Sequence, residues 1–167
     1  RLGFELVDTM AISFILAYSI YFFSKRVKAF KTKDFHKWFM FVLLSFIALL
    51  IFPNLIKTFI LRFRPYMYMG GCLDYSFYLK WLPFNFEENF RSFPSFHVAM
   101  SALLMVFYVM PKQSEKSRNM SLYRAVLWIG IVSFNRMVIG AHFLSDTLVS
   151  ILLSYIIIRI LYIKIVK

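Results

Sequence analysis

Long apolar runs separated by short polar segments dominate the hydropathy pattern of this 167-residue chain. A helix needs about 20 mostly apolar residues to span the hydrocarbon layer of a membrane. Five runs come close to that length or exceed it, at residues 8–24, 38–61, 92–110, 123–141 and 143–163. The pattern therefore predicts an all-α protein, a polytopic transmembrane helix bundle with five visible spans.

Composition supports a membrane protein, because 60% of the residues are hydrophobic, 20% are aromatic and the mean hydropathy is +0.68. No repeat or flexible linker divides the chain, which predicts a single integral-membrane domain over residues 1–167. Cys72 is the only cysteine, so an internal disulfide framework is excluded. The first residue is Arg1 rather than methionine, which leaves room for a sixth helix before it.

The net charge of +12 is unevenly distributed along the chain. The segments that follow the first, third and fifth apolar runs hold 13 of the 20 lysines and arginines, and only two acidic residues, Asp34 and Glu115. The positive-inside rule assigns these segments to the cytoplasm. Basic loops that meet anionic lipid explain the charge better than a nucleic-acid partner, so we expect membrane lipids as partners and no nucleic acid.

Ionisable and polar groups gather at the ends of the helices that this topology turns outward. Lys57 and Arg64 are seven residues apart, which predicts that they share a face at the end of the second helix. Pro94 and Ser95 are typical of a helix start, where unpaired backbone N–H groups can hold an anion. His97 follows directly in the same stretch.

The stretch "NRMVIGAHFLSD", residues 135–146, adds three ionisable groups to the same outer level. Arg136 ends the fourth predicted helix and His142 opens the fifth. The i, i+4 spacing of His142 and Asp146 allows the carboxylate to accept a hydrogen bond from one imidazole nitrogen and to direct the other outward.

Each of these residues also has a purely structural explanation. Lys57 could extend its ammonium to the lipid headgroups, Ser95 could only cap a helix, and the histidines could simply be packed. Arg136 and Asp146 could form an ion pair inside the bundle. Ionisable groups within a membrane are costly and usually functional, however, and three cations, Lys57, Arg64 and Arg136, are expected at one level. Their convergence indicates an anion-binding site.

Three segments carry a resemblance to a known family: "KTFILRFRP" (57–65), "PSFH" (94–97) and "NRMVIGAHFLSD" (135–146). Their order and spacing resemble the signature motifs of the type 2 phosphatidic acid phosphatase (PAP2) superfamily, which includes vanadium haloperoxidases and glucose-6-phosphatase. The resemblance covers about 90 residues, from the second predicted helix to the fifth, and nine fixed positions agree.

The resemblance implies a role for each matching residue. Lys57, Arg64 and Arg136 would hold the phosphate oxygens, with further hydrogen bonds from the Ser95 side chain and the Phe96 backbone N–H. His142 would be the nucleophile that forms a phosphohistidine, oriented by Asp146. His97 would be the general acid and base. The resemblance implies no metal and no cofactor, because the cations take the place of a metal clamp.

Two positions differ from the family pattern. The family usually has glycine where this chain has Phe96, and serine where it has Asn135. Glycine allows close backbone approach to a phosphate, so the Phe96 ring could narrow the pocket. Neither change removes a group that performs chemistry.

A site at the outer surface of a membrane indicates a lipid phosphate as substrate. Undecaprenyl pyrophosphate, phosphatidylglycerophosphate, phosphatidic acid and a lipid A phosphate are the candidates. The aromatic loop 66–92 could guide the lipid chain or serve only as an interfacial anchor. The small size indicates an enzyme of the bacterial inner membrane, active on the extracytoplasmic side, with no obligatory protein partner.

Two other functions remain open at this point. A silent PAP2-like protein would bind a lipid phosphate without hydrolysing it, which Phe96 makes conceivable. A transporter subunit would line a path with its charges, but transporters of this kind usually contain repeated, broken helices, and the sequence contains no such repeat.

Overall fold

The structure is a computed structural model that describes residues 32–60, 62–69, 91–110 and 113–167. Over these ranges every regular element is helical, and an isolated parallel bridge joins Arg62 to Arg91. The all-α class is therefore confirmed for the described part of the chain. The helix predicted at 8–24 and most of the aromatic loop lie outside these ranges.

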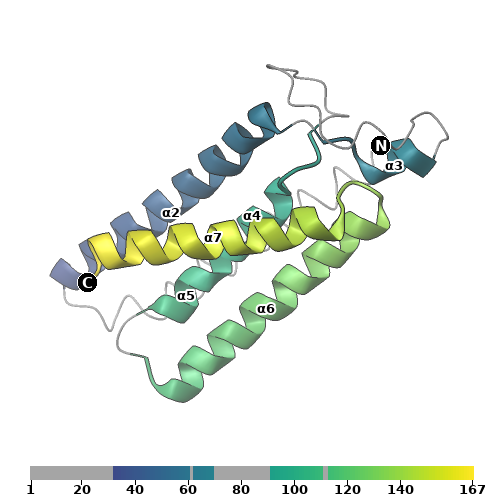
Figure 1. The fold of residues 1–167 in the computed structure, drawn as a ribbon. Coiled ribbons are helices and arrows are strands. Elements are labelled where there is room, and N and C mark those ends of the chain that lie inside the picture. Colours follow the sequence, from purple (N-terminus) through teal and green to yellow (C-terminus); the bar gives the residue numbers. More distant parts are fainter. Residues whose placement is uncertain (1–31, 61, 70–90, 111–112) are drawn as a thin grey trace.

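Four stretches of helix lie roughly side by side and form the bundle (Figure 1). In chain order the elements are α2 (Thr32–Phe59), the short α3 (Pro65–Met69), α4 (Phe96–Ser101), η3 (Ala102–Leu104), α5 (Met105–Val109), α6 (Glu115–Val138) and α7 (Leu144–Ile165). α2 packs against α7 and α4, while α4 also contacts α6 and α7. The consecutive α4, η3 and α5 thus form the central stretch of the bundle.

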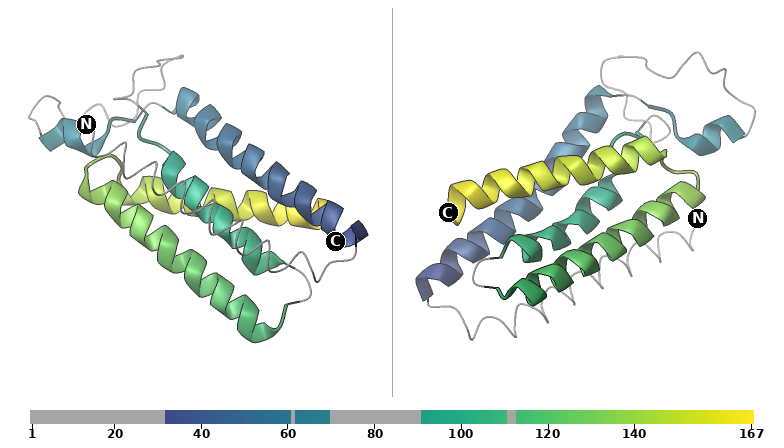
Figure 2. Two further views of the ribbon diagram at one scale, coloured as in Figure 1. Left: turned by 180° about the vertical axis from the view of Figure 1, so that it is seen from behind. Right: turned by 60° about the horizontal axis from the view of Figure 1, so that its bottom comes forward.

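The predicted motifs come from helix ends that lie at one end of the bundle. The C-terminus of α2, the N-terminus of α4, the C-terminus of α6 and the N-terminus of α7 all lie there, beside α3 (Figures 1 and 2). The C-terminus of α5, the N-terminus of α6 and the C-terminus of the chain lie at the opposite end. The alternation of helix ends expected from the distribution of charge is therefore present among these four stretches.

The third helix differs from the predicted range of 92–110. It begins only at Phe96, and η3 interrupts it before α5 ends at Val109. The helix does not begin earlier, because the Ser92 N–H donates to the Arg62 carbonyl and Pro94 lacks an N–H for a helix. Ser101 donates its hydroxyl hydrogen to the carbonyl of Val98 at 2.8 Å, a local bond that commonly bends helices.

The fourth helix also differs from its predicted range of 123–141 at both ends, because α6 runs from Glu115 to Val138. α6 begins at Glu115 rather than at 123, because the Ser114 hydroxyl caps it by accepting from the Ser117 N–H. α6 then continues through Arg136 without a break.

Only α2, from His36 to Phe59, and α7, from Leu144 to Ile165, are long and apolar enough within the described residues to cross a membrane. The other predicted spans stay predictions.

The bundle buries small polar side chains and exposes large apolar ones. Ser121, Ala125 and Ser133 are buried on α6, and Ser150 and Ser154 are buried on α7. The outward face of α6 carries large exposed side chains, namely Tyr123, Val126, Leu127, Ile131, Phe134 and Val138. Small residues let helices approach closely, whereas a continuous exposed apolar surface needs an apolar environment.

Candidate functional site

A tight turn after α6 brings His142 back against the end of that helix. Gly140 has a φ of 69°, and the backbone N–H of His142 donates to the Arg136 carbonyl at 3.2 Å. A Cβ atom added at Gly140 would lie only 3.2 Å from the Cβ atom of Tyr66. Glycine is therefore required at this turn, both for its φ and for the packing of α3.

The imidazole of His142 is buried, and its orientation is set by a backbone carbonyl. Nδ1 lies 2.6 Å from the carbonyl oxygen of Ser92. Because a carbonyl oxygen can only accept a hydrogen bond, Nδ1 carries the proton and Nε2 carries the lone pair. This tautomer leaves the lone pair of Nε2 available to act as a base or as a nucleophile.

Asp146 is fully buried at the start of α7, but it does not bond His142 directly. Its Oδ2 accepts from the Ser92 hydroxyl at 2.5 Å and from the Phe143 backbone N–H at 2.9 Å. The distance from Oδ2 to His142 Nδ1 is 3.8 Å, which is too long for a hydrogen bond. The i, i+4 spacing thus brings the two side chains close, while the hydrogen bond expected from Nδ1 goes to Ser92.

The cation that pairs with Asp146 is Arg62, which is not among the residues matched to the family motifs. Arg62 Nη1 lies 2.5 Å from Asp146 Oδ1 and 2.7 Å from Ser145 Oγ. Asp146 therefore pairs with Arg62, and not with Arg136 as the purely structural explanation required. Arg62 lies inside "KTFILRFRP" at a position that was not matched to the family, and Ser92 lies two residues before "PSFH". The extra arginine in "RFRP" was the available signal for Arg62.

The charges around His142 come from three helices. Burial lowers the pKa of His142 below its ordinary value; Lys57 on α2 and Arg136 on α6 lower it further, while the Asp146 carboxylate opposes them. The imidazole is therefore neutral at neutral pH, as a nucleophile must be.

Lys57 lies in the last turn of α2 and is buried, with 7% of its surface exposed. Its ammonium therefore does not extend to the lipid headgroups, although the purely structural explanation of Lys57 required that it should. Arg64, Arg91 and Arg136 are all close enough to Lys57 to act on it electrostatically. The charges of Arg64 and Arg136 therefore act at the position of Lys57, and the binding of an anion by these three residues stays a prediction.

The predicted geometry of Lys57 and Arg64 was wrong in one respect. They do not share a helix face, because α2 ends at Phe59 and Arg64 lies in the segment between α2 and α3. Pro65 begins α3 and disfavours helical backbone at the residue before it. Arg64 therefore approaches Lys57 from a separate segment rather than from the next turns of α2.

Two of the predicted phosphate ligands have unmet donors in the described part of the chain. Arg64 Nε and Ser95 Oγ are buried there without a hydrogen-bond partner. Ser95 is the N-cap of α4, but its side chain makes no capping hydrogen bond. Buried donors are seldom left unpaired, so each unmet donor calls for an explanation such as a ligand.

Phe96 lies between a predicted phosphate ligand and the predicted general acid. The Nζ atom of Lys57 is 6.0 Å from the centroid of the Phe96 ring, and the ring of His97 lies 5.9 Å away at a steep angle. The side chain that departs from the family pattern therefore lies within cation–π distance of the Lys57 ammonium.

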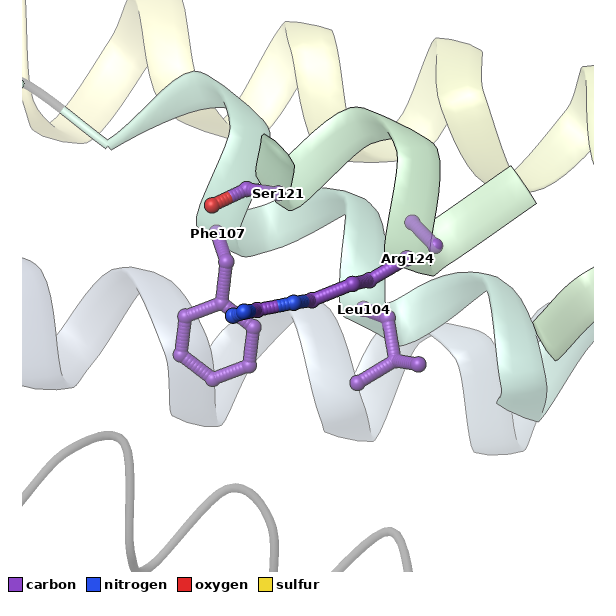
Figure 3. Close-up of a pocket in the computed structure, with 5 residues that line it drawn as sticks. Leu104, Phe107, Ser121 and Arg124 are labelled. Carbon is purple, nitrogen blue, oxygen red and sulfur yellow. The ribbon is translucent and has the colours of Figure 1, made fainter. Parts of the chain in front are cut away.

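A shallow pocket elsewhere in the bundle is separate from these residues. Leu104, Phe107, Ser121 and Arg124 line it between the η3–α5 stretch and α6, and the long side chain of Arg124 extends across it (Figure 3). Within the described ranges, no group of three or more His, Cys, Asp or Glu side chains is arranged to hold a metal ion.

Comparison with known proteins identifies the family of the chain. The searches of curated proteins and of solved structures found no match. The family model described as the PAP2 superfamily matches residues 38–167, which include Lys57 in the first motif and Asp146 in the last. The match covers most of the chain, so this protein belongs to the PAP2 superfamily.

Proposed function

We propose that this protein is a membrane-embedded phosphatase that removes phosphate from a lipid phosphomonoester or pyrophosphate through a phosphohistidine. Membership of the PAP2 superfamily indicates phosphatase activity in general. The observation that carries the finer proposal is the unmet Arg64 and Ser95 donors at a cluster of cations, beside a neutral His142 with its lone pair on Nε2. Such a cluster suits a phosphate group next to a nucleophile.

The proposed reaction has two steps, in which His142 is first the nucleophile and then the leaving group, and His97 is first the general acid and then the general base. Nε2 of His142 attacks phosphorus, the bond from phosphorus to the leaving oxygen breaks, and His97 donates a proton to that oxygen. His97 then takes a proton from a water whose oxygen attacks phosphorus, which releases inorganic phosphate and restores His142. Lys57, Arg64 and Arg136 compensate the charge on the phosphoryl oxygens in both transition states.

The arrangement of polar and apolar side chains supports a membrane location. The bundle buries serines and exposes leucine, isoleucine and phenylalanine, as expected where lipid surrounds the helices. The site lies at the end of the bundle away from Arg118 and Lys167, which the positive-inside rule places in the cytoplasm. We therefore place the site on the extracytoplasmic side, in a bacterial inner membrane.

Lipid phosphates are the substrates that such a location supports. A polyprenyl pyrophosphate, phosphatidylglycerophosphate, phosphatidic acid and a lipid A phosphate each carry the required anion at the membrane surface. The metal-independent mechanism rests on the cations, which provide the charge that a metal clamp provides in other phosphatases.

A phosphate-release assay on the purified protein in detergent tests this function. We expect release from at least one of two substrates, short-chain phosphatidic acid and a polyprenyl pyrophosphate, and we expect the rate to be unchanged by EDTA. Vanadate should inhibit competitively, because its trigonal bipyramidal form resembles the transition state. Activity that is lost on chelation and restored by magnesium would contradict the metal-independent mechanism.

A lipid-phosphate-binding protein without catalysis is the second candidate, and the Phe96 ring is the observation that favours it. The ring occupies the neighbourhood of Lys57, where the family pattern has no side chain. A cation–π contact is worth about 0.5–1 kcal/mol at exposed sites. An incoming phosphate has to compete with that contact.

Replacing Phe96 separates these two functions. We expect Phe96→Gly to lower the KM for a lipid phosphate about two- to fivefold, because the ammonium of Lys57 no longer contacts a ring. Phe96→Ala is the matched control, since it removes the ring without adding backbone freedom at the start of α4. A rise in KM in both variants would show that the ring contacts the substrate. Activity that appears only in the variants would establish the wild type as the silent binding protein.

A further inference from the structure

Arg62 lies outside the matched motif positions and contacts the site at several points. Its Nη1 pairs with Asp146 and with Ser145, and its guanidinium carbon lies 4.3 Å from the centroid of the Phe143 ring. The side chain is 18% exposed, whereas that of Asp146 is fully buried. A buried carboxylate needs such a partner, because an unpaired buried charge is strongly destabilising.

The backbone of Arg62 closes a ring of hydrogen bonds with the same residues. Its carbonyl accepts from the Ser92 N–H at 3.0 Å, and the Ser92 hydroxyl donates to Asp146. Asp146 in turn accepts from the Arg62 guanidinium. Ser92 is therefore held at its N–H and at its hydroxyl, while its carbonyl accepts the proton of His142 Nδ1.

We propose that Arg62 is a positioning residue, which acts through Asp146 and Ser92 to fix the orientation and tautomer of His142. The proposal rests on the proposed phosphatase function. Arg62 bonds the groups that hold His142, and not His142 itself, in the way that outer hydrogen-bond partners orient metal-ligating histidines. It would control how well the nucleophile is aimed and when it is protonated, while Lys57, Arg64 and Arg136 bind the phosphate.

The effect of Arg62 on protonation has a definite sign. The charged groups that act on His142 are Lys57 from α2, Arg136 from α6 and Asp146 from α7. Without the guanidinium, the Asp146 carboxylate lies uncompensated 3.8 Å from Nδ1. It would then stabilise the imidazolium more strongly, raise the pKa of His142 and make the neutral nucleophile scarcer on the acidic side.

The test compares Arg62→Gln and Arg62→Lys in steady-state phosphate release across pH. For Arg62→Gln we expect kcat to fall about 10- to 100-fold, the range that outer hydrogen-bond partners typically contribute. We also expect KM to stay within about twofold and the acidic limb of the rate profile to move to higher pH. Arg62→Lys keeps the charge and should return that limb toward the wild-type position. Arg118→Gln, an exposed arginine at the far end of α6, is the matched control and should match the wild type.

A double-mutant cycle shows whether Arg62 acts through Asp146. We expect the pair Arg62→Gln and Asp146→Asn to be no slower than Asp146→Asn alone. Additive losses, or an acidic limb that does not move in Arg62→Gln, would overturn the proposal. If Arg62→Gln fails to accumulate in the membrane, the same cycle with Ser92→Ala decides, since that change removes the hydroxyl that bonds Asp146 and the Ala141 carbonyl but keeps the Ser92 carbonyl that accepts from His142. A wild type without phosphate release would refute the phosphatase function instead, which keeps the two failures distinct.

Discussion

His142→Ala is expected to reduce phosphate release by at least about 10³-fold, to the background of the assay. The substitution removes Nε2, the atom that forms the bond to phosphorus in the proposed reaction. The cations and the Ser95 hydroxyl are untouched, so the variant should still bind phosphate. The measurement is single-turnover phosphate release together with the thermal shift that inorganic phosphate produces in detergent.

His36→Ala is the matched control for the loss of a histidine. His36 is exposed near the start of α2, at the end of the bundle away from the site, and its variant should release phosphate at the wild-type rate. Equal rates for the wild type and His142→Ala on every lipid tried would refute the phosphohistidine mechanism. The binding function would then be the remaining candidate.

Sequence spacing predicted that the candidate residues come from helix ends, and the topology brings these helix ends to one end of the bundle. Arg136 and His142 flank a short turn, and Lys57 ends α2, so their proximity follows from the alternation of the helices. The same reasoning placed Arg64 wrongly, since it continued α2 past Phe59. Pro65, directly after Arg64, was the sign in the sequence that the helix had ended, because proline disfavours helical backbone at the residue before it.

The link between Asp146 and His142 could not be predicted from the sequence. An i, i+4 spacing brings two side chains near each other on a helix, but His142 lies before the first turn of α7 rather than on it. The hydrogen-bond acceptor of Nδ1 is a backbone carbonyl, and a carbonyl has no signature in the sequence. The hydrogen bonds that join Ser92 and Arg62 to Asp146 follow from the pairing of two segments distant in sequence, which spacing alone does not predict.

Lys57→Met is expected to reduce kcat/KM about 10²- to 10³-fold while making the protein more stable to heat. Removing one preorganised group that stabilises transition-state charge typically has an effect of about that size. The stability should rise because Lys57 is a buried cation without a salt bridge in the described part of the chain. Methionine fills similar space without a charge to bury.

The two effects of Lys57→Met have one cause, namely that the ammonium is costly in the empty site and becomes favourable when an anion arrives. Inorganic phosphate or vanadate should therefore stabilise the wild type and have a much smaller effect on Lys57→Met. The matched control is Lys116→Met, at an exposed position near the start of α6, which should keep both the wild-type rate and the stabilisation by phosphate. A loss of both activity and stability in Lys57→Met, with the response to phosphate intact, would show that Lys57 supports the fold. Arg64, Arg136 and Ser95 would then have to hold the phosphate without Lys57.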